Sequence, residues 1–131
     1  MRTTFAVCVV AFGLLLGAGP AVAHHAFTAE FDAAKPLKMT GTVTKFEWTN
    51  PHAWFYIDVK DDSGTVTNWG FEMNSPNMLL RNGWTRNSLK PGDVITVEAF
   101  GARDGSHIGN AKAVTMTSTG QKLLAAPNQN Q

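Results

Sequence analysis

Apolar and polar residues alternate along much of this chain, which is the period of β-strands that bury one face. The clearest case is HAWFYIDVK at 52–60, in which every second residue is apolar, namely Ala53, Phe55, Ile57 and Val59. Five strands are predicted in this way, at 39–50, 52–60, 65–73, 94–102 and 111–118. In the first of these, Val43 and Phe46 fall on opposite faces, so we expect a β-bulge near residue 44.

Turn and helix signals separate the predicted strands. Asp61-Asp62-Ser63-Gly64 predicts a tight hairpin between the second and third strands. SPNMLLRNG at 75–83 places Pro76 at the start of a short helix and Gly83 at its end. Three strands, a helix and two strands are the element order of an OB-fold, whereas a β-sandwich would need about seven strands. We therefore predict an all-β domain with one short helix, an OB-like five-stranded Greek-key barrel.

The first 23 residues have the layout of a secretory signal peptide. An apolar run at 5–19 follows Met1-Arg2, and Ala21-Val22-Ala23 supplies the small residues of a cleavage site after Ala23. The run is shorter than the roughly 20 residues that span a bilayer, so no stable membrane anchor is expected. We predict a periplasmic or secreted protein in which an extended N-terminal arm at 24–38, a barrel domain at 39–120 and a flexible tail at 121–131 follow the signal peptide at 1–23.

Composition narrows the class of protein further. Without the signal peptide, 108 of the 131 residues remain, which is enough for one domain. These residues include 10 of the 11 basic side chains and all 10 acidic ones, so their formal charges cancel. This balance argues against nucleic acid as a partner, since such binding depends on Lys and Arg neutralising phosphates. The single cysteine, Cys8, lies in the signal peptide, so the mature chain has no disulfide.

Catalytic sequence motifs are absent. The chain has no G-x-S-x-G, P-loop or H-E-x-x-H motif. Its carboxylates are spread over several predicted strands, mostly at positions that alternation turns outward, whereas an acid–base pair must converge in one cleft. These carboxylates include Glu47, Asp58, Glu72 and Glu98. We therefore predict a binding protein rather than an enzyme, with hydrolytic activity as the remaining alternative.

The histidines suggest a metal site. Cleavage after Ala23 would place a free amine beside the imidazole of His24, and together they would chelate one metal ion. We predict His24, His25 and His52 as ligands of Cu(II) or another divalent metal. Imidazole and amine nitrogens suit Cu(II), Ni(II) and Zn(II), and copper ranks highest among them. His107 is a further candidate contact, because its loop and that of His52 flank the same surface of an OB-fold. The alternative is a terminus with two solvated imidazoles.

Two aromatic residues suggest a second kind of site. Trp54 and Tyr56 alternate with the apolar residues of 52–60, so their rings are predicted on the outer face of the barrel. OB-folds bind oligonucleotides and oligosaccharides on this face. The alternative function is therefore an aromatic-lined module that binds a carbohydrate, a peptide or a protein partner whose identity the sequence does not give. The structural alternative is that the arm covers the face, with Phe27 and Phe31 packed on Trp54.

Several stretches of the chain together resemble a known family. They are HHAFTAEFD, GTVTKFEWTNPHAWFYIDVKD, NWGFEMNSPNMLLRNGW, LKPGD and ARDGS followed by GNAKAV. This set resembles DUF6152, a family of small secreted bacterial proteins of unknown function, over roughly 24–118 and most specifically at WTNPHAW (48–54). The resemblance implies an exported β-rich domain and no particular activity. His24, His25 and His52 match the family pattern, which does not require His107.

Overall fold

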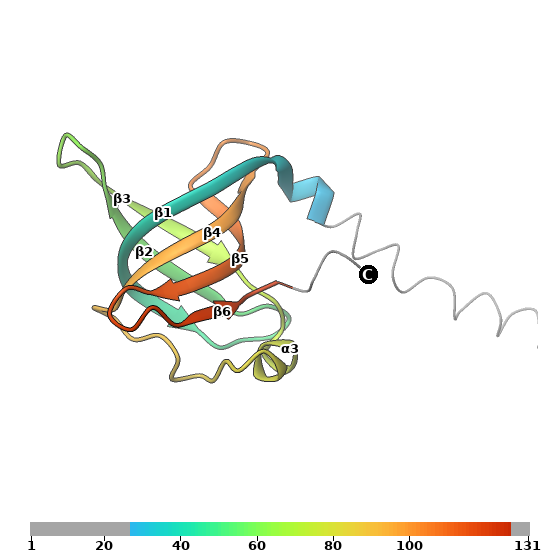
Figure 1. The fold of residues 1–131 in the computed structure, drawn as a ribbon. Helices are drawn as coiled ribbons and strands as arrows, with labels where there is room; N and C mark the ends of the chain where they lie inside the picture. Colours follow the sequence, from blue (N-terminus) through green and yellow to red (C-terminus); the bar gives the residue numbers. More distant parts are fainter. Residues whose placement is uncertain (1–26, 127–131) are drawn as a thin grey trace, which may run out of the picture. The chain divides into compact units, whose positions relative to one another are not determined.

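The structure, a computed structural model, describes residues 27–126 of the chain. Residues 27–30 form a helical turn that belongs to an N-terminal unit, and the second unit begins at Phe31. The second unit contains six described strands and one helix (Figure 1). They are β1 (Phe31–Glu47), β2 (Trp54–Lys60), β3 (Val66–Glu72), α3 (Pro76–Arg81), β4 (Val94–Ala102), β5 (Ile108–Met116) and β6 (Lys122–Leu124).

The strands form one sheet that closes on itself. Their order is β3-β2-β1-β4-β5-β6, with antiparallel neighbours throughout. A parallel pairing of β3 with β5, from Gly70 opposite Ile108 to Glu72 opposite Asn110, joins the two sides into a barrel. α3 comes between β3 and β4, so the predicted OB-like topology is confirmed, with β6 as a sixth strand.

Two segments at the ends of the second unit differ from the prediction. The predicted arm at 24–38 is, from Phe31 onward, the first half of β1, and from Pro36 it pairs residue by residue with β4. The register is irregular between Phe31 and Pro36, which is where a strand tolerates a proline. Within the predicted tail at 121–131, Lys122–Leu124 pairs with β5 as β6. A strand of three residues is too short to show an alternating pattern.

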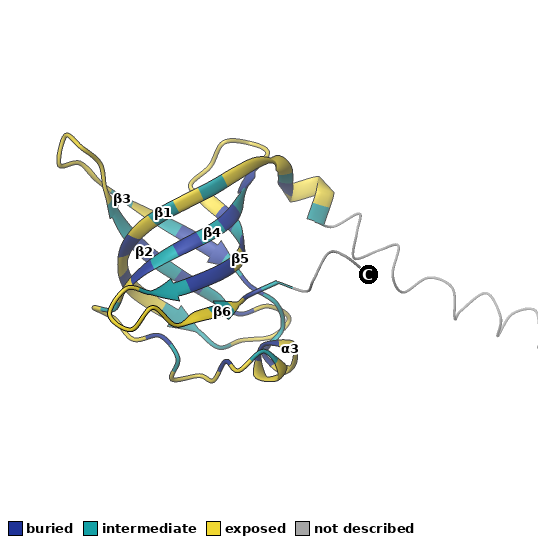
Figure 2. Ribbon diagram, viewed as in Figure 1, coloured by how far each residue is buried: buried dark blue, intermediate teal, exposed yellow. Residues whose placement is uncertain are grey.

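The core fills the inside of the barrel. Phe55 and Ile57 of β2, Phe71 of β3, and Ile95 and Val97 of β4 are fully buried. Figure 2 shows buried positions alternating with intermediate ones along β2 and β4. Across one end of the barrel, Leu79 of α3 and the following Trp84 are also buried. The indole Nε1 of Trp84 donates a hydrogen bond to the Leu124 carbonyl at 2.8 Å. This bond ties the segment after α3 to β6.

The two local irregularities expected from the sequence are present. Gly64 has a φ of 87° in the turn between β2 and β3, a conformation that favours glycine. The register of β1 against β2 shifts between Val43 and Lys45, which confirms the predicted bulge.

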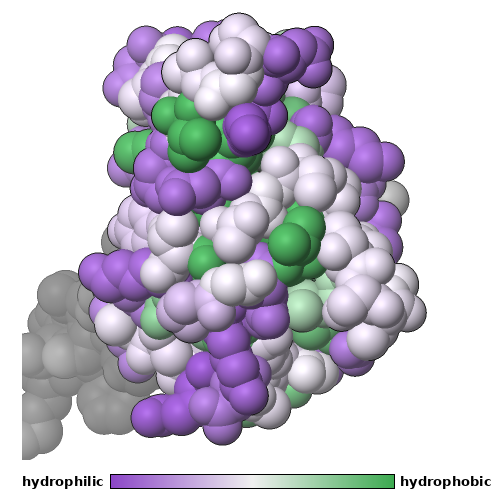
Figure 3. Space-filling view, turned by 90° about the vertical axis from the view of Figure 1, so that its left-hand side faces the viewer, coloured by the Kyte–Doolittle hydropathy of each residue, from purple (hydrophilic) through white to green (hydrophobic). Residues whose placement is uncertain are grey.

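Large exposed apolar residues, such as Val66 and Val94, are scattered over the surface. Figure 3 shows hydrophobic residues on the side it draws as separate patches among hydrophilic ones.

Candidate binding face

The outer side of β2 carries a pair of aromatic rings. Trp54 and Tyr56 are half-buried and alternate with the fully buried Phe55 and Ile57. The two outer rings are nearly parallel, with 19° between their planes, and their centroids are 6.4 Å apart. This separation is close to the roughly 6.7 Å between residues i and i+2 of a strand, so the backbone of β2 sets the spacing of the rings.

Gly70 of β3 makes room for these rings. It is buried and lies opposite Tyr56 in the β2–β3 pairing. A Cβ atom on Gly70 would lie 3.0 Å from Cε1 of Tyr56 and 3.9 Å from Cζ3 of Trp54. Both rings therefore lean over the glycine and shield its backbone, as aromatic residues do for glycines in designed sheets. This packing restricts the rotamers of the rings before any ligand arrives.

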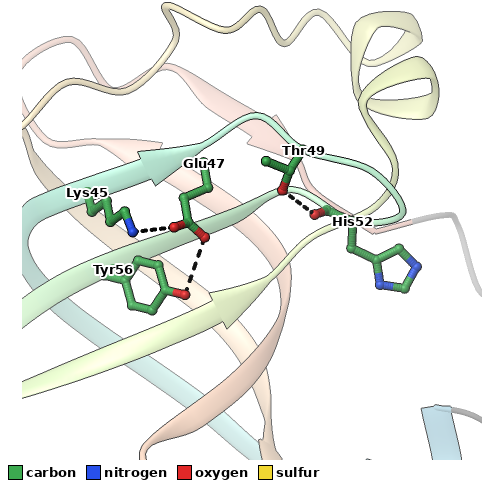
Figure 4. A network of polar contacts seen from close by, with 5 residues as sticks. All are labelled: Lys45, Glu47, Thr49, His52 and Tyr56. Atoms are coloured by element: carbon green, nitrogen blue, oxygen red, sulfur yellow. Dashed lines mark hydrogen bonds and ion pairs between the residues drawn. The ribbon is translucent and has the colours of Figure 1, made fainter.

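On the β1 side, a lysine and a glutamate border the aromatic pair. Lys45 lies opposite Tyr56 and Glu47 opposite Trp54. The Tyr56 hydroxyl donates to Oε2 of Glu47 at 3.5 Å, and Lys45 forms an ion pair with Oε1 of the same carboxylate (Figure 4). The Lys45 ammonium also lies 5.7 Å from the centroid of the Tyr56 ring. One carboxylate thus holds both neighbouring polar groups in place.

These contacts shift the pKa values of Tyr56 and Lys45. Partial burial raises the pKa of the Tyr56 phenol, and the negative charge of Glu47 raises it further. The hydrogen bond and the charge of Glu47 raise the pKa of the Lys45 ammonium. At neutral pH, Tyr56 is therefore a protonated donor and Lys45 is charged.

On the β3 side, Glu72 lies opposite Trp54 and contacts a histidine from the loop between β1 and β2. Nδ1 of His52 is 2.7 Å from Oε1 of Glu72, and the His52 side chain is 46% exposed against 13% for Glu72. The Thr49 hydroxyl donates to the His52 carbonyl at 3.1 Å, which restrains the loop. In Figure 4 the imidazole points away from Glu47 and Tyr56. A proton on Nδ1 of a neutral His52 leaves the lone pair on Nε2.

We call these residues the aromatic face. It comprises Lys45 and Glu47 of β1, Trp54 and Tyr56 of β2, and Gly70 and Glu72 of β3. One row of paired residues runs from Glu47 through Trp54 and Glu72 to Asn110 of β5. From the sequence, Glu47 and Glu72 were predicted only as solvated positions on separate strands. Alternation turned Glu72 outward and the expected bulge did the same for Glu47, but only the register reveals that they flank the same tryptophan.

The predicted metal ligands are only partly within the described residues. His24 and His25 lie outside 27–126, and His52 is the one predicted ligand inside it. Within that part of the chain, no three His, Cys, Asp or Glu side chains are grouped so that they could hold a metal ion. Phe27 belongs to the N-terminal unit, and Phe31 is buried where β1 pairs with Ala102 of β4. Cover of Trp54 by the arm stays a prediction.

His107 contacts a different part of β3 from His52. Its imidazole lies against the Trp69 ring, with centroids 4.9 Å apart, and its carbonyl accepts a hydrogen bond from Gly70. His52 instead contacts Glu72, three residues further along β3 and about 10 Å away along the strand. Both loops therefore reach β3, but the two imidazoles contact side chains on opposite faces of it.

Comparison with known proteins gives a family and a fold. A family model described as "Family of unknown function (DUF6152)" matches residues 11–112, and no curated protein matches the chain. Among solved structures, the mitochondrial single-stranded DNA binding protein Rim1 from S. cerevisiae is similar, with a TM-score of 0.50 and 12% identity over 66% of this chain and 94% of that one. At this identity the likeness concerns the fold alone. None of the described helices has the length and apolar character needed to cross a membrane.

Proposed function

Because the chain belongs to the DUF6152 family, whose function is unknown, we propose its function from its own geometry: it is a non-catalytic binding protein that holds an organic ligand on the aromatic face. One observation carries the proposal. Trp54 and Tyr56 form a nearly parallel pair, packed over Gly70 and bordered by a carboxylate on each side of Trp54. Half-buried aromatic rings with fixed polar neighbours are typical of sites that recognise ligands.

Fixed geometry supports binding because less freedom is then lost when the ligand arrives. The Glu47 carboxylate restrains Tyr56 and Lys45, and Glu72 is in contact with His52. Side chains that are already ordered avoid part of the entropy cost of association. Binding is proposed in preference to catalysis because the sequence has no catalytic motif.

The test is a screen in which immobilised oligosaccharides, peptides and oligonucleotides are probed with the wild-type protein and with Trp54→Ala. Val66→Thr is the control, because Val66 is 56% exposed and lies beside the turn of the β2–β3 hairpin, at the opposite end from Trp54. We expect ligands that bind the wild-type and control proteins but lose affinity for Trp54→Ala. If every ligand bound all three proteins equally, or if none bound, the proposal would be wrong.

Metal binding after export is the second candidate, and the contact between His52 and Glu72 favours it. A carboxylate on one imidazole nitrogen fixes the tautomer and leaves the other nitrogen as a donor, an arrangement common around protein-bound metals. Nε2 of His52 would be one donor for Cu(II), while His24 and His25 remain the predicted terminal donors. Cleavage after Ala23, which would place the protein in the periplasm or outside the cell, is part of this proposal.

Two measurements test the second candidate. Intact-mass analysis of exported protein should show a chain that begins at His24. Copper titration should then give tighter binding by the mature protein than by a peptide of residues 24–31, and weaker binding by His52→Ala. Affinity should also fall as the pH drops through the imidazole range, because protons compete for the nitrogens. Equal affinity of protein, peptide and variant would remove His52 from the site.

A further inference from the structure

We infer that the ligand of the aromatic face is a saccharide without acidic groups, an inference that rests on the proposed function of that face. The same fold serves different ligand classes, so the class has to be argued from the side chains. Three properties of the aromatic face decide it: its charge, its lack of a free backbone edge and the arrangement of its hydrogen-bonding groups.

Charge separates this face from one that binds nucleic acid. It contains one lysine and two glutamates, and the lysine is already paired with Glu47. A phosphate would have to displace Glu47 from Lys45 while lying near Glu72. Single-stranded nucleic acid instead needs a positively charged groove along its backbone beside the aromatic platform. The aromatic face has the platform without that groove.

Strand pairing separates the face from one that binds an extended peptide. β2 pairs with β1 on one side and with β3 on the other, and the next pairing, between β3 and β5, closes the barrel. A peptide that adds a strand needs an unpaired sheet edge, because main-chain hydrogen bonds supply its affinity. The aromatic face lies on paired strands, so a peptide could not bind here in that way.

A saccharide matches the groups that are present. Sugar rings pack their C–H faces on aromatic rings, and the half-buried Trp54 and Tyr56 supply two such rings, with centroids 6.4 Å apart. Around the rings, the carboxylates of Glu47 and Glu72 can accept hydrogen bonds from hydroxyl groups, and the Tyr56 hydroxyl can both donate and accept. Acidic sugars would meet the same two carboxylates and be repelled.

The experiment is calorimetric titration of the whole mature protein with four probes. Two are non-acidic hexasaccharides, of β-1,4-linked glucose and of β-1,4-linked N-acetylglucosamine, the third is an acidic hexagalacturonate and the fourth a dT oligonucleotide. We expect binding of at least one non-acidic hexasaccharide, weakened about tenfold or more by Trp54→Ala, and no binding of the acidic probes.

A matched pair of charge variants sharpens the test. Glu47→Gln should weaken saccharide binding several-fold, whereas Glu98→Gln should leave it unchanged. Glu98 also pairs with a lysine, Lys122, but lies on β4 away from the aromatic face. Trp54-dependent binding of the oligonucleotide or of hexagalacturonate would overturn the saccharide inference and leave the proposed function standing. If none of the four probes showed Trp54-dependent binding, the saccharide inference would be wrong, and the broader screen would decide the proposed function.

Discussion

The two sides of β2 show how one short strand serves both the core and the candidate site. On the inner side, Phe55 and Ile57 are fully buried, and Phe55 stacks on Phe71 of β3. On the outer side, Trp54 and Tyr56 are half-buried, and Tyr56 contacts the charged side chains of Glu47 and Lys45. Because alternate residues point to opposite faces, a substitution on one side leaves the other side largely in place. The contribution of this seven-residue strand to stability can therefore be tested separately from its proposed role in ligand binding.

The largest effect should come from the inner side. Phe55→Ala removes a fully buried ring whose centroid lies 5.2 Å from that of Phe71. We expect the free energy of unfolding to fall by about 3–5 kcal/mol, as is usual when a buried Phe becomes Ala. Urea denaturation measures this change, with Tyr56→Phe as the outer-side control. A loss below about 1 kcal/mol would mean that the two sides do not differ as the burial indicates.

Gly70→Ala should affect both properties at once. The new Cβ would lie 3.0 Å from the Tyr56 ring, so the rings of the aromatic face would have to shift. Crowding of this kind costs about 1–3 kcal/mol of stability, and ligand affinity should fall because the ring positions change. Gly101→Ala is the control, since a Cβ there would make only ordinary contacts at 3.5 Å. Equal behaviour of the two variants in denaturation and binding would contradict the role given to Gly70.

Trp54→Ala should separate the two sides most clearly. Trp54 is only half-buried, so we expect less than half the loss of stability that Phe55→Ala produces. Ligand binding should nevertheless weaken about tenfold or more, because Trp54 lies at the centre of the aromatic face. Thermal unfolding and calorimetric titration of the same sample measure both quantities. A loss of stability as large as that of Phe55→Ala would place Trp54 in the core.

The smallest effect concerns the hairpin between β2 and β3, away from both sides. Hydrogen bonds from the Ser63 hydroxyl and the Thr65 backbone lower the pKa of Asp61. Since the folded pKa is below the unfolded one, the ionised carboxylate stabilises the fold above about pH 4, and this contribution disappears as pH falls through the folded pKa. Asp61→Asn should therefore lower the Tm measured by thermal unfolding at pH 7 and approach the wild-type Tm in acid. Equal Tm values of the two proteins at pH 7 would contradict the role given to this carboxylate.

Much of the fold follows from local patterns. Period-two alternation predicts the inner residues of β2, and Pro76 and Gly83 mark the segment that contains α3. The first half of β1 could not be found in this way, because residues 33–36 are all exposed and the register is irregular there. β6 is too short to show a pattern, and it is held by its antiparallel pairing with β5 and by the hydrogen bond from Trp84 to Leu124, 40 residues further along the chain.

The candidate site depends more strongly on register than on pattern. By parity alone, Lys45 and Glu47 would share the inner face with Val43. The shift between Val43 and Lys45 turns both charged residues outward and places Glu47 opposite Trp54. The sequence predicted the bulge from the positions of apolar residues, but not which partners it would bring together. The neighbours of His52 and His107 on β3 likewise depend on loop conformations that no periodicity describes.

The length of β1 makes the unfolding of the barrel cooperative. Thr42 pairs with Asp58 of β2 and also with Val94 of β4, so one continuous strand holds both sides of the sheet. Neither β2 nor β4 can leave the barrel without losing its hydrogen bonds to β1. The pairing of Phe31 with Ala102 also joins residues far apart in the chain. We therefore expect the barrel to unfold as one cooperative unit and to fold slowly for its size, because distant segments must meet before any of them is stable.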